Sequence, residues 1–249
     1  MIWGVEMRAV DLFEGALLPG SVVSVIYDSY SSAWQIPFML LKRELDRGCF
    51  GVISNYNLPF SGLVRHVGMV GFDVMGALKE NRLAIIDAFD SRYQTARENV
   101  PNVFYLDKVE PETLNPKIDR IYYGPLREIL TGTCVVRLIH TLDGAALLLG
   151  EDSTLKLLNH TLALRSVQLP DSILILGLNM DVVSTKFKAW AVGISDYVLL
   201  SDSKLEDEGV KERVYLLRAP YKDFEPAMYS LHTTKQEGIE KLKVKKLSP

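Results

Sequence analysis

Short apolar runs alternate with segments of helical periodicity along most of the chain. The run at residues 22–26 is rich in β-branched side chains, which is typical of a strand buried on both faces. Because strands and helices alternate, the pattern predicts an α/β fold with a mostly parallel sheet and helices on both faces. The other predicted strands lie at residues 50–54, 83–86, 134–139, 172–176, 197–200, 213–217 and 228–231.

The first helices are predicted between these early strands. Residues 37–45 have helical spacing, and Gly48 follows them as the expected C-cap. Residues 63–78 also have helical spacing, but several glycines divide that segment into shorter pieces. We therefore expect one intact helix and one broken helix in this part of the chain.

Two more helices are predicted further along. Residues 91–100 form a short polar helix that Pro101 stops. Residues 154–167 form a longer one, with Asp152 or Ser153 as its N-cap. Residues 101–124 are rich in proline and charge and are predicted as surface structure. After residue 197 the strands are separated by turns instead of helices, which predicts an antiparallel extension at one edge of the sheet.

Length and charge favour a single domain. The chain has 249 residues, 48% hydrophobic and 24% charged, with a net charge of −3. A near-neutral charge argues against a globally basic nucleic-acid-binding protein, although a local patch stays open. We expect one domain at residues 1–234 and a basic C-terminal tail at residues 235–249. The tail is expected to be a solvated terminus, with an anion-binding patch or a terminal strand as alternatives.

The two cysteines, Cys49 and Cys134, lie in apolar stretches without metal-ligand spacing. We expect buried free thiols, which suit a reducing, cytoplasmic location. No uninterrupted apolar run reaches about 18 residues and no signal peptide is visible, so neither a membrane span nor secretion is expected. The four histidines are scattered, so no metal site is expected either.

The junction between residues 17–26 and 27–35 carries the clearest resemblance to a known family. The sequence LLPGSVVSVI followed by YDSYSSAWQ resembles the opening "lpGsvvlIeGepGsGKTtla" of KaiC-like members of the RecA superfamily. Further similar segments follow in the same order at residues 54–59, 81–89, 135–150, 181–184 and 196–200. The chain also resembles a small uncharacterised archaeal protein family that lacks the Walker motifs. The resemblance implies a RecA-like three-layer sandwich with an antiparallel extension near the C-terminus.

The phosphate loop of that family is not reproduced here. Such a loop needs glycines for close backbone approach, a lysine for the β- and γ-phosphates, and a hydroxyl for Mg²⁺. In the matching positions this chain has no glycine, and it carries Ala33 for the lysine and Trp34 for the hydroxyl residue. Ordinary ATP binding is therefore not expected.

The other nucleotide-site positions are also altered. His140 occupies the end of the strand where the family carries a metal-supporting aspartate, and Asp143 lies one helical turn beyond. The turn at residues 55–57 reads Asn-Tyr-Asn and offers no carboxylate to orient a water. We predict no catalytic, cofactor-binding or metal-binding residue. The vestigial nucleotide-site positions are Tyr27, Asp28, Ser29, Ser31, Ser32, Ala33, Trp34, Tyr56 and His140.

These observations predict a non-catalytic RecA/KaiC-like protein, a pseudo-ATPase with a binding, regulatory or scaffolding role. A homo-oligomer is the expected assembly, with a dimer as the first expectation and a related active ATPase as the other partner. Nucleic acid is the least expected partner.

The alternative is a small-molecule or anion-binding protein, or an enzyme, that uses a rebuilt pocket at the carboxyl ends of the strands. Ser29, Ser31 and Ser32 precede a helix, and Ser32 with Gln35 forms a potential capping box. His140 and Asp181 would have to converge with this loop on an open pocket.

Overall fold

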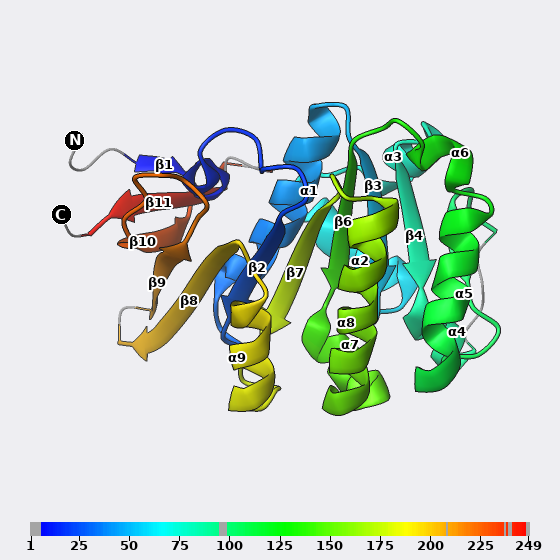
Figure 1. Cartoon of the computed structure of the whole chain (residues 1–249). Helices are drawn as coiled ribbons and strands as arrows, with labels where there is room; N and C mark the ends of the chain where they lie inside the picture. The colour runs from blue at the N-terminus through cyan, green and yellow to red at the C-terminus, as the bar shows by residue number, and fades with distance from the viewer. Residues whose placement is uncertain (1–5, 95–98, 208, 237, 239–240, 248–249) are drawn as a thin grey trace.

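The computed structural model describes residues 6–94, 99–207, 209–236, 238 and 241–247. Within these residues, eleven strands form one sheet in the order β1-β11-β10-β9-β8-β2-β7-β6-β3-β4-β5 (Figure 1). The strands from β8 to β5 along this order run parallel, and β8 to β1 in the other direction pair antiparallel. The antiparallel extension predicted at one edge is therefore present.

The parallel strands begin and end close to where the apolar pattern places them. All six residues of β2 are buried, as are all six of β3, in keeping with central strands covered on both faces. The strands are β1 Glu6–Arg8, β2 Val22–Tyr27, β3 Phe50–Asn55, β4 Leu83–Asp87, β5 Val103–Tyr105, β6 Val135–His140, β7 Ile173–Asn179, β8 Tyr197–Glu206, β9 Gly209–Arg218, β10 Ala227–Thr233 and β11 Leu242–Lys246.

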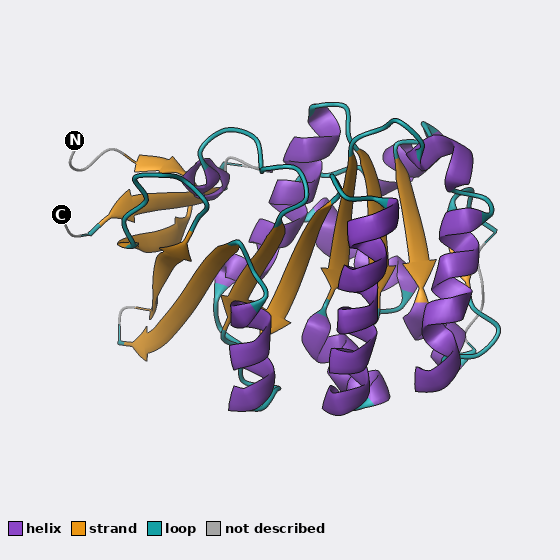
Figure 2. Cartoon of the chain, in the orientation of Figure 1, coloured by secondary structure: helices purple, strands orange, loops and turns teal. Residues whose placement is uncertain are grey.

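Helices cover both faces of the parallel part of the sheet, which gives three layers (Figure 2). One face carries α1 Ile36–Asp46, α2 Phe60–Gly68 and α3 Val74–Lys79, together with the 3-10 helix η1 Ala9–Phe13. The other carries α5 Pro111–Tyr123, α7 Leu142–Leu149, α8 Glu151–Gln168 and α9 Thr185–Gly193. The remaining helices are η2 Ser32–Gln35, α4 Ala88–Tyr93 and α6 Arg127–Leu130.

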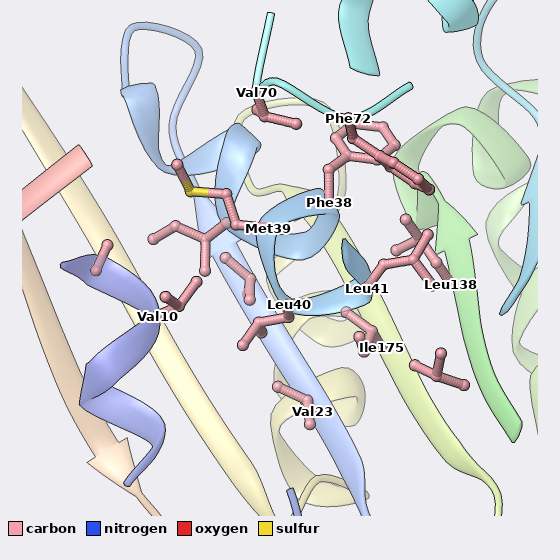
Figure 3. Close-up of a cluster of buried hydrophobic side chains, with 14 of the residues drawn as sticks. Val10, Val23, Phe38, Met39, Leu40, Leu41, Val70, Phe72, Leu138 and Ile175 are labelled. Carbon is pink, nitrogen blue, oxygen red and sulfur yellow. The ribbon is translucent and has the colours of Figure 1, made fainter. Parts of the chain in front are cut away.

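Helix α1 anchors the first of the two cores. It follows η2 directly, and eight of its eleven residues are buried. Leu41 points toward the sheet, where Leu138 of β6 lies next to it, and Phe38 lies beside Phe72 (Figure 3). This packing fixes the segment that begins at the carboxyl end of β2.

Several elements differ from the sequence predictions. The segment 101–124, predicted only as surface structure, contains strand β5 and helix α5, which the sequence analysis did not identify. Helices α7 and α9 were not predicted. The helix predicted at 91–100 begins earlier, as α4, because the Asp87 carboxylate accepts a hydrogen bond from the Asp90 amide and caps it. Residues 95–98 of that prediction lie outside the described residues.

The cap of the long helix α8 is also different. Neither Asp152 nor Ser153 is the N-cap, because the helix begins at Glu151 directly after Gly150. Gly150 has a φ of +85°, a conformation that side chains rarely adopt. The backbone of a glycine therefore makes the turn from α7 into α8.

The predicted basic tail contains a strand. Leu242 and Val244 of β11 are fully buried, and β11 pairs with β10 on one side and β1 on the other. The terminal-strand alternative therefore describes residues 242–246, and the prediction of a solvated terminus is wrong there. The two ends of the described chain lie side by side at the far edge of the sheet (Figure 1).

Cys49 and Cys134 form a disulfide, so the prediction of two free thiols is wrong. Each cysteine immediately precedes a strand, and those strands, β3 and β6, are parallel neighbours that pair Phe50 with Val135. The register of the sheet thus brings the two sulfurs together across 85 residues of sequence. In the described part of the chain, no helix is long and apolar enough to cross a membrane.

Candidate functional site

The candidate site is the loop at residues 28–35, between the carboxyl end of β2 and helix α1 (Figure 1). Strand β2 lies between β7 and β8, with Tyr27 paired to Asn179 and Ile26 to Leu200. The loop therefore lies at the carboxyl edge of the parallel sheet, where open α/β proteins bind their ligands.

Five successive backbone amides of this loop donate hydrogen bonds within the protein. Three of the acceptors are carboxylates, whereas in an anion-binding loop such amides donate to phosphate oxygens. The bonds run from Ser29 to Asp181 Oδ2 at 2.9 Å, from Tyr30 to Asp28 Oδ1 at 3.0 Å, from Ser31 to the Asp28 carbonyl at 3.2 Å, from Ser32 to Glu212 Oε2 at 2.6 Å and from Ala33 to Ser31 Oγ at 3.0 Å.

Glu212 makes the largest contribution to this arrangement. It lies on β9, and its carboxylate also accepts hydrogen bonds from Ser31 Oγ at 2.9 Å and Ser32 Oγ at 2.7 Å. Ser31 Oγ further bonds Ser201 Oγ of β8 at 2.7 Å. The β8–β9 hairpin therefore supplies the charge that satisfies the loop.

Two more predicted positions take part in the same network. Asp28 is nearly buried, and its carboxylate accepts hydrogen bonds from the amide and the hydroxyl of Ser203 on β8. The capping box predicted for Ser32 and Gln35 is wrong, because Ser31 caps η2 by accepting from Ala33. Ser32 instead directs both of its donors to Glu212.

Aromatic rings pack together where the loop joins helix α1. The Trp34 ring lies 6.4 Å from that of Phe38 and 5.2 Å from that of His66, measured between centroids. His140 lies 4.6 Å from Phe38. Burial, with a smaller contribution from the nearby His66, lowers the pKa of His140 to about 3, so the ring is neutral at physiological pH.

The remaining predicted positions do not join this cluster. Burial raises the pKa of Tyr27, and the nearby Asp143 adds to the effect. Asp143 is itself buried and accepts a hydrogen bond from the Asn179 amide at 2.9 Å, which makes it a structural link between α7 and β7. Tyr56 is buried in the core on the opposite face, beside Tyr122 and Arg137.

The alternative hypothesis, a rebuilt pocket at the strand ends, requires His140, Asp181 and the loop to open onto one pocket. The carboxylate of Asp181 is instead bonded to the Ser29 amide, and His140 is buried against Phe38. His140 Nε2 has no hydrogen-bond partner among the described residues. These groups therefore do not form an acid–base pair.

The structure also contains a buried carboxylate, Asp87 of β4, that the sequence analysis did not predict as a site residue. Asp87, at the end of β4, is fully buried and accepts hydrogen bonds from Asn55 Nδ2 at 3.0 Å and the Asp90 amide at 2.8 Å. Burial is the main cause that raises its pKa, to about 6. In the sequence, Asp87 is an aspartate directly after a predicted strand. Aspartates in turns and helix caps occupy the same kind of position, so this signal does not identify a buried acid.

The raised pKa of Asp87 predicts a pH-dependent stability. Because the folded pKa lies above the unfolded value of 3.8, folding takes up a proton, and stability falls as pH rises through this window. Between about pH 4.5 and 7 the loss from this group should be about 2 kcal/mol. Urea unfolding at several pH values should show the unmodified protein losing about this much stability relative to Asp87→Asn, because asparagine does not titrate. An identical pH dependence in both proteins would contradict it.

Two solved structures have the same overall fold. An uncharacterised protein of Pyrococcus horikoshii, PH0321, whose crystal structure is described as a complex with an unknown peptide, matches with a TM-score of 0.78 and 19% identity over 96% of this chain and 97% of its own. The KaiC-like protein PH0186 of the same organism matches with a TM-score of 0.67 and 17% identity over 96% of each chain. No protein-family model and no curated protein sequence matches the chain. The similarity establishes a RecA-like α/β fold of the KaiC-like kind.

Proposed function

We propose that this chain is a non-catalytic KaiC-like protein, a pseudo-ATPase that acts by binding a partner in a regulatory or scaffolding role. One observation carries the proposal: the amides of the loop after β2 are already bonded inside the protein, three of them to carboxylates. An ATP phosphate would have to displace Asp28, Asp181 and Glu212 and would be repelled by their charges.

The side chains around the loop support the same reading. Ala33 and Trp34 stand where the resembled family carries a lysine and a Mg²⁺-binding hydroxyl. Neither can neutralise phosphate charge or hold a metal. Phe38 packs against both Trp34 and His140, and in this proposal the three rings take the space that a nucleotide would need.

The proposal includes three candidate partners. A second copy of this chain is the first expectation, since two-fold assemblies are the commonest oligomers, and a related active ATPase is the second. A peptide is a further candidate, because the similar Pyrococcus protein is described with one bound. We place the protein in the cytoplasm as part of the same proposal.

Calorimetric titration with Mg-ATP and Mg-ADP tests the proposal. We expect no saturable binding tighter than about 1 mM, and no phosphate release above a protein-free blank. A KaiC-like ATPase treated in parallel serves as the positive control. Saturable binding by either nucleotide, with or without hydrolysis, would overturn the pseudo-ATPase assignment. Sedimentation equilibrium on the same sample gives the oligomeric state, where a monomer at all concentrations would refute self-association.

A further inference from the structure

A large cavity lies at the opposite end of the sheet from the loop at residues 28–35. It has a volume of about 840 Å³ and opens where β6 and β7 begin, beside the ends of α5 and α8. This size falls within the range of small-molecule sites, about 300–1,000 Å³. Leu130, Val135 and Leu169 provide apolar walls, and Tyr122 lies at its inner side.

A second, much smaller cavity adjoins the first. Tyr122, Gln168 and Leu169 line both, so these side chains stand between the outer and the inner space. The inner cavity has a volume of about 20 Å³, enough for one water-sized group. Its walls also include Arg137 of β6 and Arg165 of α8.

The two arginines differ in what they contact. Arg165 donates to the carbonyl oxygens of Gly20, Ser21 and Ser172, and so ties α8 to the starts of β2 and β7. Arg137 makes no ion pair with any described residue, and its Nε has no hydrogen-bond partner there. The guanidinium instead lies 4.6 Å from the centre of the Tyr122 ring.

Two polar groups lie near Arg137, although none of the described carboxylates is within ion-pair distance of it. The Tyr122 hydroxyl is buried next to the Arg137 guanidinium; burial raises its pKa, and the charge and hydrogen bonding of Arg137 partly oppose that rise. Asp119 also lines the inner cavity, and its carboxylate lies 3.4 Å from His160 Nε2, which is charged only when protonated. A half-buried cation is stabilised further when an anion pairs with it.

We propose that the two cavities form one binding site for a monocarboxylic acid with an apolar body. One carboxylate oxygen enters the inner space and accepts from Arg137 and the Tyr122 hydroxyl, and the apolar body fills the outer cavity against Leu130 and Leu169. Asp171 also lines the outer cavity, and its negative charge disfavours a second carboxylate on the ligand. The site goes beyond the proposed function, since it does not depend on the state of the loop after β2.

The test compares an acid with its neutral counterpart. Phenylbutyrate and phenylbutanol are titrated calorimetrically at neutral pH, and the acid is expected to bind about tenfold more tightly because of the charge-assisted bonds to Arg137. Arg137→Gln should reduce this preference to about one, with phenylbutanol binding unchanged. Arg127→Gln is the matched control: it removes an equal charge from the exposed rim of the outer cavity and should keep most of the preference.

Each other outcome has a defined meaning. Equal binding of acid and alcohol by the unmodified protein would overturn the carboxylate assignment, and absence of binding by both would overturn the site. Loss of the preference in Arg127→Gln but not in Arg137→Gln would place the anion on the rim and contradict the proposal. If Arg137→Gln does not fold, Tyr122→Phe removes only the hydroxyl, and it should lower the preference about threefold.

Discussion

Removal of the Cys49–Cys134 disulfide is expected to lower the free energy of unfolding by about 4 kcal/mol. The bridge closes a loop of 85 residues, and in the chain-entropy model a loop of this length restricts the unfolded state by about 4–5 kcal/mol. Native disulfides typically contribute about 2–4 kcal/mol, which sets the lower end. Urea unfolding of the Cys49→Ser/Cys134→Ser protein beside the oxidised parent measures the difference.

Reductant provides the control for this experiment. It should destabilise the parent by the same amount and leave the double variant unchanged. Detection of two free thiols in the denatured, unreduced parent would show that the bridge does not form in solution. The disulfide also removes one argument for a reducing compartment, because that argument rested on two free thiols.

The apolar pattern predicted the central strands well because burial on both faces leaves a strong signal. Residues 22–27 form a fully buried strand that the β-branched run identifies. Helices and strands in segments with mixed signals were not predicted. The prolines and charges of 101–124 indicated surface structure, yet Pro111 occupies the first turn of α5, where proline is favourable. In β11, Leu242 and Val244 alternate with outward lysines, and the lysine content obscured this period of two.

For the candidate site, the sequence predicted which groups are missing but not which groups replace them. The absent glycines and lysine are visible in residues 27–35. Glu212, however, lies 180 residues beyond Ser32 and reaches it only through the β8–β9 hairpin. The disulfide was missed for the same reason: its cysteines meet through the β3–β6 register, which no local spacing encodes.

Replacement of Glu212 by alanine is expected to destabilise the protein by about 3 kcal/mol. The carboxylate accepts three hydrogen bonds, from the Ser32 amide and from the hydroxyls of Ser31 and Ser32. Hydrogen bonds to charged groups contribute about 1.5–3 kcal/mol each, but the partial exposure of Glu212 and solvent screening reduce the sum. Glu206→Ala is the matched control on the same hairpin, since its exposed pair with Lys211 should contribute at most about 1 kcal/mol.

The Ser32 amide, once it has lost its acceptor, should also bind an external anion. Loss of an ordinary surface contact would not create such a site. In Glu212→Ala the Ser32 amide and two hydroxyls lose their acceptor at a helix start, an arrangement that favours sulfate or phosphate. Sulfate should therefore raise the midpoint of thermal unfolding more in Glu212→Ala than in Glu206→Ala, where only its general stabilising effect operates. Equal shifts in the two variants, together with equal stabilities, would show that Glu212 does not take the place of a phosphate in this loop.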